Sequence, residues 1–253
     1  MKKTPTKQSG FTLIELLTVI VIIGVLSTLV FTGTKGLIMS AQKSKAASDM
    51  SNIWKSYMVY ENDNGSIDET LDGEKMVDTD GDTPSAGSGT NHEWFAVLAS
   101  SIKDFNNPEK FILSSDKYAK KKNKGKEIEF VLDPDEEDDP KIDQVFKEAQ
   151  LSYNVVAGID LDEMSNVPEG KIPFIYTPGL NDEGKWTKNG VFGTSGGIIC
   201  FMDGQSKRLK NLKEAKLKKW DDPKEDADNL KDSVFGIAFG HGGPDEFSGE
   251  RGE

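Results

Sequence analysis

The sequence predicts an α+β fold in which one long N-terminal helix packs on a small antiparallel β-sheet domain. Residues 11–31 carry a single charge, at Glu15, and residues 35–61 continue with apolar side chains at near-helical spacing among polar ones. Short apolar or alternating runs, bounded by Pro, Gly and Asn, follow in the second half of the chain. Such runs are typical of the strands of an antiparallel sheet.

The first apolar segment has the length of one membrane crossing. At about 1.5 Å per residue, residues 11–31 extend roughly 31 Å as a helix, close to the hydrocarbon thickness of a bilayer. Lys2, Lys3 and Lys7 precede it, so we expect the N-terminus to stay in the cytoplasm and the rest to face out. A secretory signal fits less well, because the run is longer than a typical signal, contains an acid and has no A-x-A-like cleavage site.

We expect the helix to have two parts. Residues 11–32 form the transmembrane helix, and residues 33–62 form its amphipathic continuation, with Gly33 and Gly36 as the bend. Residues 62–65, Asn-Asp-Asn-Gly, are a typical helix stop. The apolar positions of the continuation are Leu37, Ile38, Ala41, Ala46, Ile53, Trp54, Tyr57 and Tyr60.

The remaining chain is predicted to form an α+β globular domain over residues 63–239, followed by a disordered tail over residues 240–253. Residues 63–92 lack periodicity and are expected to be a long loop, and residues 93–105 are a candidate helix. The predicted strands are Ile128–Leu132, Leu151–Ala157, Ile172–Tyr176, Gly190–Phe192 and Ile198–Met202.

Two further local patterns concern turns and charge. The run around Asp203 and Gly204 predicts a hairpin with these two residues as its turn. Residues 116–126 are rich in lysine, whereas residues 133–140, DPDEEDDP, are acidic and bounded by prolines. We expect both charged segments to be solvated loops, and their opposite signs allow them to pair within the protein or across a subunit contact.

Composition excludes several classes of function. The net charge is −12, and nearly all acids lie beyond residue 60, so no nucleic acid is expected as a partner. Cys200 is the single cysteine, and His92 and His241 are isolated histidines expected on the surface or in loops. No pair of carboxylates with a cleft and no nucleophile elbow is present, and Gly193–Gly197 lacks the ending of a phosphate-binding loop. The chain is therefore predicted not to be an enzyme.

The N-terminal motif resembles that of type IV pilins and the pseudopilins of type II secretion. The shared features are a basic leader, Gly10, a hydrophobic first residue at Phe11, and Glu15 at the fifth position after the glycine, all in register with an apolar span. The resemblance implies that residues 1–10 are a leader peptide, cleaved after Gly10 by prepilin peptidase, and that Phe11 becomes N-methylated. It also implies that Glu15 is the assembly glutamate, whose partner is the amino terminus of a neighbouring subunit.

This pairing is physically reasonable. Cleavage exposes an amine with a pKa around 8, and in a medium of low dielectric this amine and a carboxylate lower each other's desolvation cost. Such a pair sets the axial register of two subunits, as a buried polar residue does in a coiled coil. The alternative for Glu15 is a shallow position from which its carboxylate reaches the headgroups, and the two roles are compatible.

The resemblance implies a structural subunit of a pilus-like filament, most simply a type II secretion pseudopilin. Its expected partners are further copies of itself, other pseudopilins or pilins, prepilin peptidase, the inner-membrane platform protein and the membrane. We expect a single-pass protein of the cytoplasmic membrane with its C-terminal domain periplasmic or at the cell surface. The alternatives are a type IV pilin for adhesion, motility or DNA uptake, and a membrane-tethered periplasmic binding protein that does not polymerise.

No cofactor is implied, with one possible exception. Asp78, Asp80 and Asp82 alternate as calcium ligands do, and Gly81 permits a tight turn between them. The twelfth position of an EF-hand loop would hold a glutamate, and here it is Gly89. A calcium site and a solvated acidic turn are the two interpretations.

Overall fold

The computed structural model describes most of the chain, in two compact units. The described residues are 11–65, 67, 91–133, 141–157, 159, 164–181, 183–219, 222–228, 230, 233 and 237–238, without the side chains of residues 28–35, 157, 237 and 238. One unit comprises residues 1–42 and the other residues 43–253. The second unit is called the domain below.

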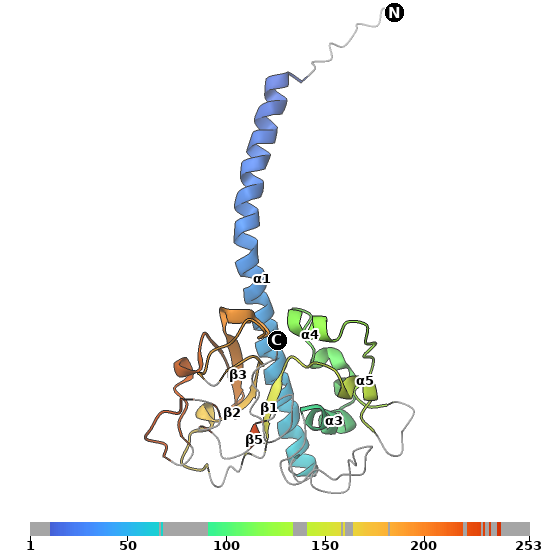
Figure 1. Ribbon diagram of the computed structural model, residues 1–253, viewed down its shortest axis with the longest axis vertical. Coiled ribbons are helices and arrows are strands. Elements are labelled where there is room, and N and C mark those ends of the chain that lie inside the picture. Colours follow the sequence, from blue (N-terminus) through green and yellow to red (C-terminus); the bar gives the residue numbers. More distant parts are fainter. Residues whose placement is uncertain are drawn as a thin grey trace, which may run out of the picture. The chain divides into compact units, whose positions relative to one another are not determined.

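A single helix begins the structure. Helix α1 extends from Leu13 to Asn64, over 52 residues, and is coloured blue to cyan in Figure 1. It ends as its sequence predicts: Gly65 has a φ of +85°, and its N–H donates to the carbonyl oxygen of Glu61 at 3.0 Å. A left-handed glycine just after the last turn is a common helix terminus, because glycine lacks the Cβ that would clash there.

The expected membrane span lies partly outside the described side chains. Among the side chains that are described, no helix carries an apolar stretch long enough to cross a membrane. The expected span, residues 11–32, includes residues 28–32, whose side chains are not described.

The domain half of α1 is amphipathic, as predicted. Ala46, Met50, Ile53 and Tyr60 are buried, and their spacings of four, three and seven place them along one face of a helix. Trp54 and Tyr57 are partly buried beside them. The prediction is wrong for Leu37, Ile38 and Ala41, which are exposed, Leu37 by 72% and Ile38 by 55%. All three precede Lys43, where the domain begins.

The sheet is antiparallel throughout, which confirms the predicted α+β class. Its five strands lie in the order β4-β3-β2-β1-β5, with each neighbouring pair antiparallel. The strands are β1 (Asn154–Ala157), β2 (Pro173–Tyr176), β3 (Gly197–Phe201), β4 (Ser206–Leu209) and β5 (Ile237–Ala238). Every residue of β2 and β3 is buried, in agreement with their continuous apolar sequences.

The predicted hairpin forms between β3 and β4, but its turn differs from the expected one. Phe201 N–H donates to the Gln205 carbonyl at 3.0 Å, and Gly204 N–H donates to the Phe201 carbonyl at 2.8 Å. Only Gly204 within the turn has a positive φ, +76°, so the loop has three residues and ends in a left-handed glycine. The tip packs on α1, where Trp54 Nε1 donates to the Met202 carbonyl at 2.9 Å.

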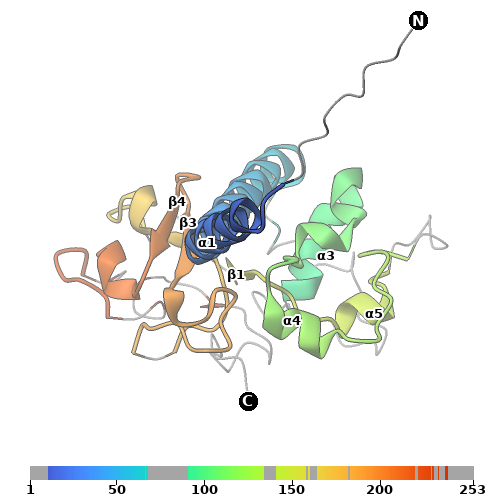
Figure 2. The ribbon, with the colours of Figure 1, turned by 90° about the horizontal axis from the view of Figure 1, so that it is seen from above.

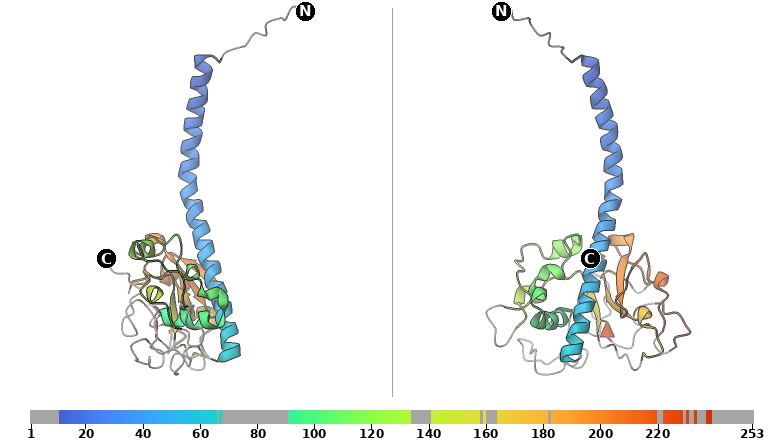
Figure 3. Two further views of the ribbon diagram at one scale, coloured as in Figure 1. Left: turned by 90° about the vertical axis from the view of Figure 1, so that its right-hand side faces the viewer. Right: turned by 180° about the vertical axis from the view of Figure 1, so that it is seen from behind.

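The sheet lies on one side of the domain half of α1, and helices lie on the other side, as Figures 2 and 3 show. These helices are α3 (Asn91–Ser101), α4 (Lys117–Lys122) and α5 (Gln144–Lys147), with 3-10 turns at Lys103–Asn106 and Pro108–Lys110. Three further 3-10 turns, Glu169–Lys171, Gly193–Ser195 and Leu212–Ala215, lie between or after the strands along the chain. Aromatic rings connect the two sides. The ring centroid of Tyr57 on α1 lies 4.6 Å from that of Phe174 on β2 and 5.6 Å from that of Trp94 on α3.

Several local predictions are wrong. Within residues 128–132 only Leu132 pairs, in an isolated bridge with Ile142, and residues 190–192 lie in turns. The lysine-rich segment is not a plain loop, because α4 forms within it. His92 is buried on α3, with Nε2 2.8 Å from the Ala149 carbonyl.

Some predicted segments lie outside the described residues. They are most of the 63–92 loop, the 134–140 stretch, His241 and the 240–253 tail. Their predictions stand as expectations.

Substitution of Asp116 by alanine is expected to destabilise the domain by about 1–3 kcal/mol. Asp116 is fully buried and caps α4, because Oδ1 accepts from the N–H groups of Tyr118 at 3.1 Å and Ala119 at 3.0 Å. Its Oδ2 accepts from Ser152 Oγ at 2.8 Å, and alanine would leave these buried donors unpaired. Denaturant unfolding of the chain measures the loss.

The matched control for this prediction is Asp143→Ala. Asp143 also caps a helix, α5, by accepting from Phe146 N–H at 2.9 Å, but it is only partly buried. We expect a cost of about 1 kcal/mol or less. Equal effects of the two substitutions would contradict a special role for the buried network around Asp116.

Candidate functional site

The first turn of α1 is closed by a capping box between Thr12 and Glu15. Glu15 Oε2 accepts hydrogen bonds from Thr12 N at 2.9 Å and from Thr12 Oγ1 at 2.7 Å. The N–H of Glu15 lies 3.4 Å from Thr12 Oγ1. Thr12 is thus the N-cap and Glu15 the third residue of the helix, an arrangement that satisfies two backbone donors at the helix start.

The signal for this capping box is visible in the sequence. A threonine followed three residues later by a glutamate, at the start of an apolar run, is its usual pattern. The two predicted roles of Glu15, pairing with another subunit and reaching the headgroups, did not include this contact within the chain. Within the chain, the structure instead shows Thr12 as the hydrogen-bond partner of Glu15.

Between Phe11 and Ser27 the described surface of α1 and its N-cap is largely apolar apart from this carboxylate. Every described side chain from Phe11 to Ser27 is exposed, including Phe11 at 80% and Leu13 at 86%. The hydroxyl of Thr18 is turned back onto the helix, where Oγ1 lies 2.9 Å from the Glu15 carbonyl and 3.0 Å from the Ile14 carbonyl. A helix that is apolar on all sides is characteristic of a membrane span or of the centre of an assembly.

The predicted processing residues are placed only in part. Phe11 is described and lies immediately before the N-cap, whereas Gly10 lies outside the described residues. Asp78, Asp80 and Asp82 also lie outside them, so calcium binding stays a prediction. Among the residues that are described, no three His, Cys, Asp or Glu side chains gather in a way that would hold a metal ion.

Cys200 is expected to resist alkylation in the folded chain. Its side chain is fully buried in β3, and burial raises the pKa of the thiol to about 11. At pH 8 the thiol is therefore protonated, and the thiolate is the reactive form. Mass spectrometry after iodoacetamide treatment should show modification only once denaturant is added, and rapid labelling of the native chain would contradict this burial.

Comparison with known proteins finds a match that includes the first turn of α1. Residues 5–31 match the family described as the prokaryotic N-terminal methylation motif. The chain thus carries the prepilin-type N-terminus that type IV pilins and pseudopilins share, as the sequence predicts.

Two curated relatives carry the same name, Type II secretion system core protein G. The chain is 38% identical over 73 residues to the protein of Pectobacterium carotovorum subsp. carotovorum and 42% identical over 73 residues to that of Escherichia coli (strain K12). The matched part is 29% and 28% of this chain and 47% and 50% of the relatives, so the chain spans about half the length of the curated relatives it matches. No solved structure matches.

The names of both relatives describe a component of a secretion system and not an enzyme. This agrees with the predicted lack of catalytic function.

Proposed function

We propose that this chain is a structural subunit of a pilus-like filament, namely a type II secretion pseudopilin. It is anchored in the cytoplasmic membrane by residues 11–32, with its leader in the cytoplasm and its domain outside. In the assembled pseudopilus it contributes to protein export. The names of the two relatives support secretion over adhesion, motility or DNA uptake.

One observation carries this proposal: a fully exposed apolar helix whose first turn holds a carboxylate. Twelve large apolar side chains from Phe11 to Leu26 are between 44% and 86% exposed. Leaving this apolar surface in contact with water costs about 25 cal/mol of free energy for every Å². Lipid covers it before assembly, and the helices of neighbouring subunits cover it in a filament. A tethered binding protein would need the lipid contact but would not need Glu15 at this position.

Processing changes the electrostatics of the first turn. We propose that prepilin peptidase cleaves between Gly10 and Phe11, and that Phe11 is then N-methylated. The released amine has a pKa of about 8 and is positively charged at neutral pH. A positive charge at a helix N-terminus is unfavourable because the dipole is positive there as well. The amine therefore gains by pairing with a carboxylate.

Glu15 supplies that carboxylate between subunits. In the single chain both contacts with Thr12 are made by Oε2, and a carboxylate has a second oxygen that can accept further hydrogen bonds. We propose that this second oxygen accepts from the amine of a neighbouring copy while the capping box is retained. The pairing then sets the axial offset between copies, and the platform protein and other pseudopilins take part in assembly.

Fractionation of cells that produce the chain with a type II secretion system tests this proposal. We expect the mature protein to begin at N-methylated Phe11 by mass spectrometry, and to appear in the sheared filament fraction as well as in the membrane. A chain that is cleaved but stays entirely in the membrane, while other pseudopilins assemble, would favour the tethered binding protein instead.

A further inference from the structure

Exposed lysines cover α4 and the turn that follows it. This lysine surface consists of Lys117, Lys120, Lys121, Lys122 and Lys124, all of which are exposed. Within the described part of the chain, none of them forms an ion pair with a carboxylate. The acid that begins this stretch, Asp116, is fully buried as the N-cap of α4. A chain with a net charge of −12 thus has a locally positive surface.

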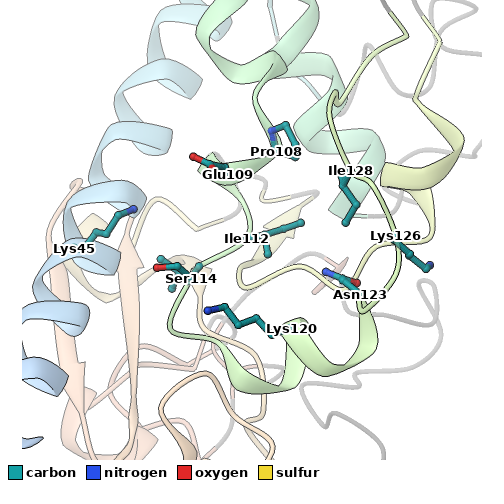
Figure 4. A pocket seen from close by; sticks show the side chains of 10 residues that line it. Lys45, Pro108, Glu109, Ile112, Ser114, Lys120, Asn123, Lys126 and Ile128 are labelled. Carbon is teal, nitrogen blue, oxygen red and sulfur yellow. The ribbon is translucent and has the colours of Figure 1, made fainter.

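A cavity adjoins this surface. Its volume is about 420 Å³, and its charged lining consists of three lysines, Lys45, Lys120 and Lys126, and one acid, Glu109. Apolar side chains of Pro108, Ile112, Leu113 and Ile128 line the rest together with Ser114 and Asn123. Figure 4 shows Lys120 at one edge, with Lys45 on α1 across the cavity from it. Lys45 pairs with Asp49 at 2.7 Å and Lys126 with Glu148 at 3.3 Å. Lys120 has no such partner among the described residues, so its ammonium group can bind an incoming carboxylate.

The same chain contains a segment of opposite charge. Residues 133–140 comprise six acidic residues and two prolines. The described residues at its base are joined: Asp133 N–H donates to the Lys141 carbonyl at 2.9 Å, and Leu132 pairs with Ile142. The two ends of the acidic segment are therefore held side by side.

We propose that the acidic segment of one copy docks on the lysine surface and the adjoining cavity of the next copy in the filament. The inference rests on the proposed function, because it requires copies to meet in an ordered array. Two different surfaces of the same chain form the contact, and a heterologous contact repeats from copy to copy as an open helical filament when its rotation does not close a ring. Two lysine surfaces, or two acidic segments, repel each other, which disfavours contacts that pair either surface with itself.

The contact is expected to direct assembly more than to hold it together. Single exposed ion pairs stabilise little, and salt screens them over about 8 Å at physiological ionic strength. Complementary clusters instead raise the rate of encounter and fix the register of the partners. The apolar lining of the cavity offers contact area to the prolines of the acidic segment.

Disulfide trapping between two differently tagged copies tests the proposal. One copy carries Lys120→Cys and the other Glu137→Cys, and both are produced with the secretion system. Cys200 is fully buried and does not compete. After mild oxidation we expect a heterodimer that contains both tags. The matched control is Lys188→Cys, an exposed lysine far from α4 in sequence, which should give no heterodimer above background.

Charge exchange provides the second variant. Lys120→Glu in a copy that carries Lys121→Cys should lower disulfide trapping with Glu136→Cys of the other copy by about tenfold. Lys120→Glu together with Glu137→Lys should restore trapping. Trapping should also decrease as salt concentration rises.

The outcomes separate this contact from the proposed function. Filaments that contain the chain but give no heterodimer would overturn the contact and leave the function intact. A disulfide within a single copy that carries both cysteines, without heterodimer, would place the contact inside one chain and also overturn it. Absence of the chain from filaments would reject the proposed function, and the contact with it.

Discussion

Replacement of Glu15 by glutamine should remove the chain from filaments although the first turn of α1 keeps its capped geometry. Glutamine at this position can accept from Thr12 as glutamate does, because the capping box accommodates either residue. It lacks the negative charge that pairs with the released amine of a neighbouring copy. We expect normal membrane insertion and cleavage after Gly10, with the sheared filament fraction reduced to background.

Thr12→Val is the matched control. It removes the hydroxyl that lies 2.7 Å from Glu15 Oε2 and leaves the carboxylate in place. The helix start should be less ordered, but filaments should still contain the chain. Immunoblots of membrane and filament fractions, with mass spectrometry for processing, distinguish the variants. Normal assembly of Glu15→Gln combined with failure of Thr12→Val would show that Glu15 acts by capping its own helix.

Replacement of Gly197 by alanine is expected to destabilise the domain by about 3 kcal/mol or more. A Cβ at this position of β3 would lie 2.1 Å from Trp186 Cε2 and 2.4 Å from Thr177 Oγ1. The indole cannot easily withdraw, because it is buried and its Nε1 donates to the Thr177 carbonyl at 2.8 Å. Thermal or denaturant unfolding of the chain measures the change.

Gly36→Ala is the control for a glycine that has space around it. Among the described atoms, none outside the helix backbone lies within 4 Å of a Cβ at this position in α1, and alanine favours a helix over glycine by about 1 kcal/mol. Its effect should therefore be neutral or slightly stabilising. A Gly197→Ala chain as stable as the original would show that the contact between β3 and Trp186 relaxes freely.

The long helix and the β3–β4 hairpin were predictable because their signals are local. A buried stripe at helical spacing from Ala46 to Tyr60 follows directly from the order of apolar residues. The hairpin required only an apolar run, a glycine that adopts a positive φ and a second run. The length of its loop depends on the hydrogen bond between Phe201 and Gln205 across the turn. The pair Asp203 and Gly204 alone does not specify that bond.

The wrong predictions concern residues whose conformation depends on distant partners. Residues 190–192 are apolar but form turns, because Gly190 packs against the backbone of Gly179. A Cβ on Gly179 would lie 2.3 Å from the Gly190 Cα. Helix α4 forms in a lysine-rich segment because Ser152, distant in sequence, completes the buried hydrogen bonds of its N-cap. Neither contact is visible in a local window of sequence.

The apolar helix with a carboxylate at the fifth position after Gly10 follows from the local order of residues. Helix formation, capping and exposure of apolar groups there depend on neighbours within one turn. The architecture of the domain, and the charges that stay available on its surface, depend instead on tertiary packing. It buried Asp116, paired Lys45 and Lys126, and left Lys120 exposed at the edge of a cavity. Charges that lie far apart in sequence acquire partners only when the chain folds, and their availability for a neighbouring copy follows from that packing.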